Sequence, residues 1–116
     1  MKQLTAIIRQ EKLEVLKEAL FDAGIRGMTI SQVQGCGNQH GWKEYVRGTE
    51  VLLNTIPKVK FDIVVDEDQV DGLIQVICSA THTGGVGDGK IFVYDVENVV
   101  KVRTGEVNYA ALQDVE

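Results

Sequence analysis

This chain has little of the residue types that build disulfide frameworks or metal centres. Its 116 residues include one proline, two cysteines and two histidines. Cys36 and Cys78 lie far apart and form no C-x-x-C motif, so a disulfide or thiolate site is disfavoured, and buried, inert thiols in a reduced protein are expected. His40 and His82 lack the spacing of metal ligands, which favours ordinary polar loop histidines.

Long hydrophobic runs and an excess of positive charge are also absent. No apolar stretch is long enough to span a bilayer, and the first residues enter a strand pattern directly, which indicates no signal peptide and a cytoplasmic protein. The formal net charge of −5 argues against general nucleic-acid binding. Hydrophobic and charged contents of 44% and 25% are ordinary and, at this length, predict one domain with its own core.

Catalytic motifs are missing as well. The sequence has no G-x-S-x-G elbow and no H-E-x-x-H helix motif. Most of its carboxylates fall on predicted helix faces, where a solvated role is the default. We therefore expect a binding protein rather than an enzyme.

A glycine-rich stretch, Thr83 to Val93, stands out among what is present. Four glycines lie between a helical and a strand pattern, and Lys90 follows the last of them. Gly84 to Lys90 matches G-x-x-x-x-G-K, but Ile91 replaces the Ser or Thr of a P-loop, and the helix precedes the loop instead of following it. A phosphate-holding loop is our interpretation, because backbone N–H groups in such bends attract anions; a mobile connection is the alternative.

Hydrophobic periodicity predicts an α+β protein. Strands are expected over about 3–9, 25–34, 59–65 and 90–96, with an irregularity near Gln32, and helices over about 11–23 and after Asp66, where Gln69 completes a capping box. The β-α-β, long loop, β-α-β order is that of a ferredoxin-like split βαβ sandwich. Helices would cover one sheet face, and Ile7 and Val64 on the other face favour an oligomer. Residues 99–105 resemble a short strand or hook ending in a turn.

The segment 35–56 shows no clean period. A loop near 20 residues in so small a domain is usually functional or disordered. Its apolar triplet, Val51 to Leu53, suggests a partner surface. A hairpin extension that packs on itself is the alternative.

Five basic residues are candidates to surround the glycine-rich stretch: Arg9, Lys58, Lys90, Lys101 and Arg103. Arg9 lies at a strand end and Lys58 at a strand start, while Lys101 and Arg103 are expected to point the same way on one short strand. Strand ends can converge in a split βαβ fold, within a subunit or across subunits. Cations around a glycine loop without a base or nucleophile indicate polyanion binding rather than turnover, although any one of them alone would be a surface cation.

Five segments together resemble the PII nitrogen-regulatory signal proteins. The likeness extends from Met1 to about Glu106 in register, and it is closest to the paralogue type that pairs with ammonium channels. The segments are Ala6–Arg9, Gly24–Thr29, Pro57–Lys60, Thr83–Val96 and Arg103–Glu106.

The resemblance implies a single domain over 1–116 that forms a ferredoxin-like homotrimer with nucleotide sites between subunits, where ATP and ADP compete. It implies a long flexible loop at about 37–55, a phosphate loop at about 82–90 and a C-terminal hook at about 98–116. The implied nucleotide-binding residues are Thr29, Gly37, Gly87, Asp88, Gly89, Lys90, Lys101 and Arg103. Two positions depart from the family: Lys101 stands where many members have arginine, and Asn38 replaces a common arginine.

The resemblance also implies a 2-oxoglutarate site that Mg-ATP helps to build. Gln39 matches the residue whose side-chain oxygen meets the Mg²⁺, and Lys58 matches the residue that pairs with the distal carboxylate. The implied 2-oxoglutarate-binding residues are Arg9, Gln39, Gly41, Lys58 and Gly87. ATP with 2-oxoglutarate would favour one arrangement of the long loop and ADP another.

The long loop would carry the output. Arg47 matches the arginine that enters the pore of the ammonium channel, with Val51, Leu52 and Leu53 as flanking contacts, so reversible membrane association through a transporter is expected; nitrogen-assimilation enzymes or regulators are further partners. Val51 stands where enteric-type members carry a uridylylated tyrosine, and without a hydroxyl it cannot be modified. Thr49 occupies the position of a phosphorylated serine in some members.

Two alternatives remain open. A PII paralogue with an altered effector response, such as regulation of nitrogenase or sensing of ATP and ADP only, fits the changes at Asn38, Lys101 and the long loop. A ferredoxin-like enzyme of the acylphosphatase kind would need an arginine and a catalytic asparagine that the glycine loop lacks.

Overall fold

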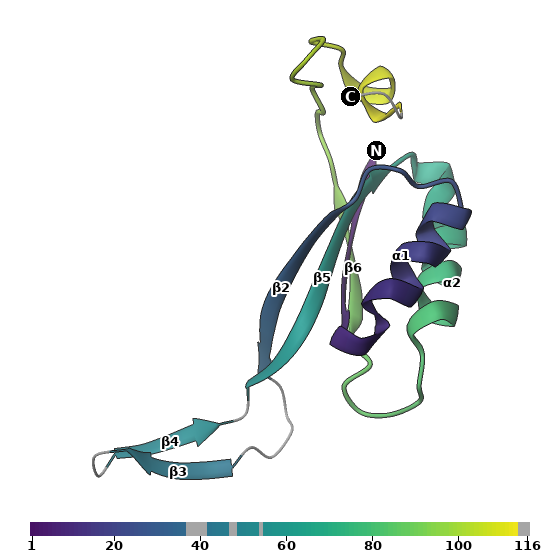
Figure 1. The fold of residues 1–116 in the computed structure, drawn as a ribbon. Coiled ribbons are helices and arrows are strands. Elements are labelled where there is room, and N and C mark those ends of the chain that lie inside the picture. Colours follow the sequence, from purple (N-terminus) through teal and green to yellow (C-terminus); the bar gives the residue numbers. More distant parts are fainter. Residues whose placement is uncertain (37–41, 47–48, 54, 114–116) are drawn as a thin grey trace.

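A computed structural model of the chain describes residues 1–36, 42–46, 49–53 and 55–113, with side chains described only outside 37–54. Figure 1 shows helices packed on one face of the main sheet, with a separate hairpin and a C-terminal segment extending from opposite ends. The elements are β1 (Lys2–Arg9), α1 (Leu13–Asp22), β2 (Thr29–Cys36), β3 (Trp42–Val46), β4 (Thr49–Leu53), β5 (Thr55–Val65), α2 (Val70–Thr81) and β6 (Lys90–Asp95). Short 3₁₀ turns at Gln10–Lys12, Glu67–Gln69 and Asn108–Leu112 complete the described structure.

The main sheet has the strand order β2-β5-β1-β6, and each neighbouring pair is antiparallel. This order, with both connections crossing over on the same face, is the predicted ferredoxin-like α+β arrangement. The two strands in the middle, β1 and β5, come from opposite halves of the chain. Their ends therefore bring residues that are about 50 positions apart side by side, as in the pair Arg9–Lys58.

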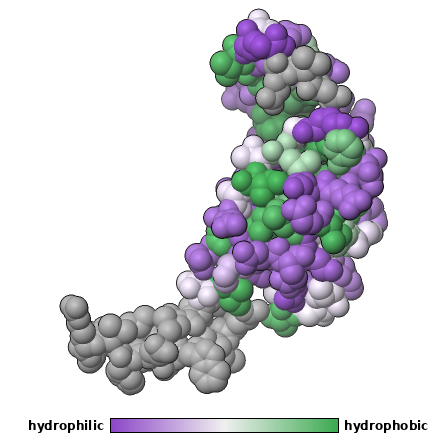
Figure 2. Space-filling model, viewed as in Figure 1, coloured by the Kyte–Doolittle hydropathy of each residue, from purple (hydrophilic) through white to green (hydrophobic). Residues whose placement is uncertain are grey.

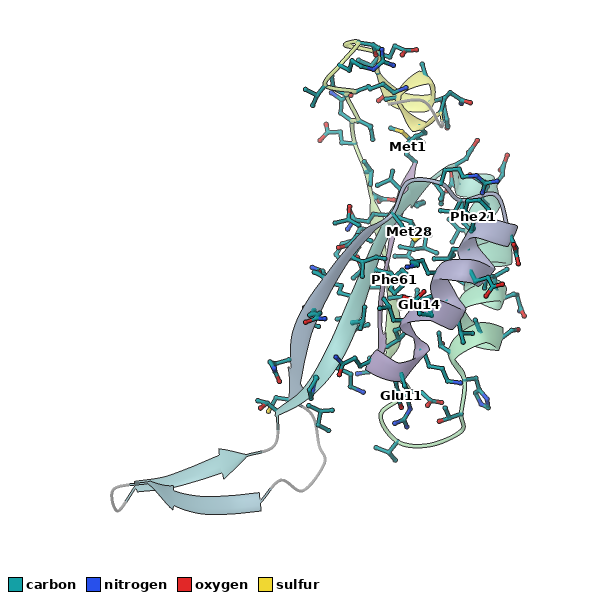
Figure 3. The ribbon with its side chains drawn as sticks, viewed as in Figure 1. Met1, Glu11, Glu14, Phe21, Met28 and Phe61 are labelled. Atoms are coloured by element: carbon teal, nitrogen blue, oxygen red, sulfur yellow. The ribbon has the colours of Figure 1, made fainter. Side chains whose placement is uncertain are left out.

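The hydrophobic core follows from the alternation of β1 and β5. Leu4, Ala6 and Ile8 lie opposite Ile63, Phe61 and Val59, and all six are buried. Phe61 lies between the sheet and the helices (Figure 3). The helices contribute Leu16 and Leu20 from α1 and Leu73 and Ile77 from α2, at the spacing that the sequence predicted for one apolar face.

Of two local predictions, the capping box before α2 and the irregularity in β2, only the first is confirmed. The capping box is confirmed, because the backbone N–H of Asp66 donates to Gln69 Oε1 at 3.1 Å. The irregularity near Gln32 is wrong: β2 pairs with β5 residue for residue, from Thr29–Asp62 to Cys36–Thr55. The polar residues of β2 lie on an exposed edge strand, so its broken alternation reflects weak burial and not a bulge.

The prediction of buried cysteines is also wrong. Cys36 and Cys78 are both exposed, and neither is in a disulfide. Cys36 is the last residue of edge strand β2, and Cys78 follows the buried Ile77 on α2, which turns it off the core face. A shift of one position along a helix, or a place at a strand end, decides whether each cysteine is buried. The number of cysteines in the sequence does not reveal this position.

The stretch expected as a long loop contains the paired strands β3 and β4, in register from Trp42–Leu53 to Val46–Thr49. This is the hairpin that the sequence left as the alternative. It extends beyond the ends of β2 and β5 (Figure 1). Gly37, Asn38, Gln39, Gly41 and Arg47 lie outside the described residues.

Of the two forms expected for 99–105, a short strand or a hook, the structure has no strand there, and the C-terminal segment 97–113 is here called the hook. Val100 forms an isolated bridge with Val107, and the N–H of Gly105 donates to the Lys101 carbonyl at 2.7 Å. This bond closes a turn, with Gly105 at φ +76°, before a strand can extend. The turn itself agrees with the prediction.

Much of the hook and of strand β6 exposes apolar side chains. Figure 2 shows hydrophobic surface mixed with hydrophilic residues on the body and on the hook. Phe92 and Tyr94 of β6 are 42% and 51% exposed, and Val102 of the hook is 99% exposed. Among the described residues, no helix is both long and apolar enough to cross a membrane.

Candidate functional site

The glycine loop, residues 82–89, connects α2 to β6 at the end of the sheet where β1 finishes. Gly87 and Gly89 have φ values of +105° and +101°, which only glycine adopts without strain. A Cβ at Gly89 would lie 1.8 Å from the carbonyl oxygen of Ile7. The loop is therefore pressed against the backbone of β1 at a point that tolerates no side chain.

The carboxylate of Asp88 organises the loop. Its Oδ2 accepts from the backbone N–H groups of Thr83 and Gly84, each at 2.9 Å. Its Oδ1 accepts from the Thr83 hydroxyl and from Arg9 Nε, the latter at 3.0 Å. The Thr83 hydroxyl, followed by the two backbone N–H groups and Arg9, holds the pKa of Asp88 well below its usual range. Two of the loop's N–H groups are thus already matched to an internal anion.

Two cations from neighbouring strands reach the same loop. Arg9 and Lys58 are paired across β1 and β5. A terminal nitrogen of Arg9 donates to the carbonyl of Val86 at 2.8 Å, and the Lys58 ammonium donates to the carbonyl of Gly87. The structure therefore brings together Arg9, Lys58 and Gly87, three of the five residues predicted for 2-oxoglutarate; the other two, Gln39 and Gly41, are outside the described residues.

The predicted nucleotide residues are only partly together. Gly87 to Lys90 are contiguous, and Lys90 is exposed at the start of β6. Thr29 is exposed at the start of β2, opposite Asp62, four residues along β5 from Lys58. At a strand rise of about 3.3 Å per residue this places Thr29 about 13 Å from that end of the sheet.

Lys101 and Arg103 lie at the other end of the molecule. The hook that carries them follows β6, whereas the glycine loop precedes it, and Figure 1 shows the two at opposite ends of the sheet. Lys101 is buried within the hook, and its Nζ lies 3.7 Å from Oε1 of Glu106. One chain therefore does not bring these two cations to the glycine loop.

The sequence did not single out Thr83 and the link between Arg9 and Asp88. A signal was available for the first: a threonine that opens a glycine run, with an aspartate five residues later, can close a loop through side-chain to backbone hydrogen bonds. The second joins residues 79 positions apart, so no local pattern could reveal it. Among the described residues, no group of three or more histidine, cysteine or acidic side chains could hold a metal ion.

Comparisons with known proteins agree on one family. The family model described as "Nitrogen regulatory protein P-II" matches residues 1–106. The "Nitrogen regulatory protein P-II" of Pasteurella multocida is 50% identical over 112 residues, which cover 97% of this chain and all of that protein. "Nitrogen regulatory protein GlnK" and "Nitrogen regulatory protein P-II 1" of Escherichia coli are 46% and 47% identical over the same shares.

Proposed function

The chain belongs to the nitrogen regulatory protein P-II family, and from this premise we propose that it senses ATP, ADP and 2-oxoglutarate and transmits their levels by direct contact with a partner protein. Members of this family are regulatory proteins and not enzymes. The proposal concerns which ligands this chain binds, which of its residues bind them, and which partner responds.

The observation that carries the proposal is the meeting of Arg9 and Lys58 at the glycine loop. In the structure the Lys58 ammonium bonds to a neutral carbonyl, that of Gly87. A carboxylate is a stronger partner for an ammonium group than a neutral carbonyl is, because the opposite charges of the two groups also attract each other. The end of a dicarboxylate such as 2-oxoglutarate fits this position, with Arg9 close by.

The backbone from Gly87 to Lys90 fits a phosphate chain. The absence of a side chain at Gly87 leaves the backbone there accessible, and Lys90 adds an exposed positive charge. Asp88 would contribute through its main chain, because its carboxylate oxygens are taken up within the loop. Thr29 and Gly37 would lie nearer the base and sugar, and Mg²⁺ bound with ATP, held through Gln39, would supply positive charge to the dicarboxylate.

The phosphate cations Lys101 and Arg103 would come from another copy of the chain. Their position at the far end of the sheet rules out a contact with the glycine loop of the same chain, whereas a homotrimer could bring the hook of one subunit to the loop of the next. The exposed apolar residues of β6 and the hook provide surface for such an assembly.

The output would pass through the segment 37–55. Arg47 and the β4 residues Val51, Leu52 and Leu53 would contact an ammonium transporter or an enzyme or regulator of nitrogen metabolism. The ligands would shift the population of arrangements of this segment. The protein would act in the cytoplasm and join the membrane reversibly through the transporter. Val51 excludes uridylylation at its own position, and Thr49 is a candidate for phosphorylation.

A second candidate function is sensing of ATP and ADP alone. It is favoured by the pairing of Arg9 with Asp88, which already balances one of the two charges that a dicarboxylate would use. The changes at Asn38 and Lys101 also leave the effector response open. Regulation of nitrogenase would be one use of such a paralogue.

Calorimetric titration of a matched pair of lysine variants tests the proposal. Lys58→Gln removes the ammonium at the loop, and Lys60→Gln removes one on the same face of β5 that lies 3.7 Å from Asp62. With Mg-ATP present, we expect Lys58→Gln to weaken 2-oxoglutarate binding about tenfold or more, the effect of losing a charged hydrogen bond, and to change ATP binding less than about twofold. Equal 2-oxoglutarate affinities in the two variants would refute the assigned site.

A further inference from the structure

Asp88 lies between two parts of the proposed site, the backbone of the glycine loop and the side chain of Arg9 from β1. Its Oδ2 faces the loop backbone at Thr83 and Gly84, and its Oδ1 faces the side chains of Thr83 and Arg9. The carboxylate thus accepts from four donors in two elements that lie far apart in the sequence. An exposed surface aspartate does not need so many partners, since water would serve.

Arg9 completes the link from the side of β1. Its Nε bonds to Asp88 at 3.0 Å, and a terminal nitrogen bonds to the Val86 carbonyl at 2.8 Å. A Cβ placed on Gly85 would lie 3.1 Å from that nitrogen, so the loop backbone packs directly on the guanidinium. Any movement of the loop changes the surroundings of Arg9, and any new partner of Arg9 changes the loop.

We propose that Asp88 is a positioning residue that holds the glycine loop and Arg9 in one arrangement, so that nucleotide affinity depends on Arg9 although Arg9 does not contact the nucleotide. The ligand part of this inference rests on the proposed function. A loop that is already ordered loses less conformational entropy when it receives phosphates, which is why a positioning residue raises affinity without touching the ligand.

Two substitutions of Asp88 separate its two contacts. Asp88→Ala removes all four hydrogen bonds. Asp88→Asn retains one oxygen, which is expected to face the N–H groups of Thr83 and Gly84, because the alternative would place an NH₂ group against two donors. The NH₂ group then faces the Thr83 hydroxyl, which can turn to accept from it, and Arg9, which can only donate. This variant therefore keeps the backbone contacts of the loop and loses the contact with Arg9.

Amide hydrogen exchange of the ligand-free protein tests the loop contacts. We expect exchange at Thr83 and Gly84 to become about tenfold faster in Asp88→Ala, the scale set by a hydrogen bond to a charged group, and to stay near the wild-type rate in Asp88→Asn. Asp95→Asn is the control, because Asp95 forms an ion pair with Lys2 at the opposite end of β1. Wild-type exchange rates in Asp88→Ala would overturn the proposal.

Mg-ATP titrations of a double-mutant cycle, without 2-oxoglutarate, test the link to Arg9. We expect Arg9→Gln to weaken Mg-ATP binding about fivefold in the wild-type background and less than about twofold in the Asp88→Asn background, as for residues that act as a unit. Asp95→Asn should leave the effect of Arg9→Gln unchanged. Simple addition of the Arg9→Gln and Asp88→Asn effects, or no effect of Arg9→Gln, would overturn the link.

The two measurements also separate this inference from the function on which it rests. If the wild-type protein binds no Mg-ATP, the proposed function fails, and hydrogen exchange still decides whether Asp88 holds the loop. If the wild-type protein binds Mg-ATP normally and the cycle is additive, the function stands and the positioning role is wrong.

Discussion

At the scale of single residues, the site depends on Gly89, which has no room for a side chain, and on Asp88, whose carboxylate accepts hydrogen bonds from the loop. Gly89 lies against the Ile7 carbonyl, where a Cβ would come to 1.8 Å, and its φ of +101° disfavours any side chain. Contact with backbone leaves nothing flexible to move aside. Gly89 is therefore fixed by geometry and not by loop flexibility.

Gly89→Ala should lower the free energy of unfolding by more than about 1 kcal/mol, because the left-handed backbone and the close carbonyl both oppose the methyl group. Gly72→Ala is its matched control: Gly72 lies exposed in α2 with open space for 4 Å around the place where a methyl group would stand, and alanine there should stabilise by about 1 kcal/mol. Urea denaturation of both variants measures these opposite signs. Equal effects would contradict the packing described for Gly89.

The titration of Asp88 provides a second prediction at this scale. Its pKa is lowered in the folded state, so its contribution to stability is complete above the ordinary aspartate value of about 3.9 and is lost as the pH falls through the lowered value. The carboxyl carbon resonance of Asp88 should titrate below that ordinary value. Thr83→Ala should move the midpoint upward, because the Thr83 hydroxyl is the largest cause of the shift.

Thr104→Ala is the control for this titration, since the Thr104 hydroxyl bonds to the Glu106 carboxylate in the hook at 2.8 Å. It should leave the midpoint of Asp88 in place. A midpoint at the ordinary value in the wild-type protein, or one that Thr83→Ala does not move, would show that the hydrogen bonds to Asp88 are not maintained in solution.

At the scale of elements, most of the fold was predictable because its helices and strands bury one face each. Hydrophobic residues alternate around Ile8 and Phe61, as in strands, and recur at helical spacing at Leu73 and Ile77. This periodicity is clear enough to identify the type and order of the elements. The edge strand β2 has no such pattern, which is why an irregularity was expected where none exists. The sequence of the hairpin β3–β4 shows no clean period, so its strands could only be an alternative.

Leu16→Ala should lower the free energy of unfolding by about 2–5 kcal/mol, because Leu16 of α1 is fully buried against the sheet. Val15→Ala, one residue earlier and 48% exposed on the outer face of the same helix, should cost far less. Thermal unfolding followed by circular dichroism compares the two. A similar loss in both would contradict the assignment of the buried face of α1.

The candidate site was predictable at a coarser level than the fold. The glycines, Arg9, Lys58 and Lys90 could be named from the sequence, because residue type and the family resemblance point to them. The pairing of Arg9 with Asp88 could not, because it depends on the strand order that places β1 between β5 and β6. Whether Lys101 and Arg103 converge on a glycine loop could not be judged either, since such a convergence would depend on a second chain.

At the scale of the whole molecule, the proposed nucleotide site requires an assembly of several chains. A single chain leaves the hook and the glycine loop at opposite ends of the sheet and exposes Phe92, Tyr94 and Val102. Apolar surface of this kind usually marks a protein interface. The two halves of the proposed nucleotide site become neighbours only if copies of the chain pack side by side.

The wild-type protein should sediment at about three times the 12.8 kDa chain mass. Phe92→Asp should shift the protein toward lighter species, because a charge would replace an apolar side chain on the sheet face away from the helices. Phe21→Asp, at an exposed residue on the helical side, is the control and should leave the assembly intact. A wild-type monomer in analytical ultracentrifugation would contradict the proposed shared site.

Calorimetric titration of the purified wild-type protein with 2-oxoglutarate, with and without Mg-ATP, measures directly whether the two ligands bind together. We expect 2-oxoglutarate to bind when Mg-ATP is present and to bind much more weakly, or not measurably, when Mg-ATP is absent, since the nucleotide and the dicarboxylate would share the glycine loop. Binding of Mg-ATP with no response to 2-oxoglutarate would contradict the account and leave a sensor of adenine nucleotides alone.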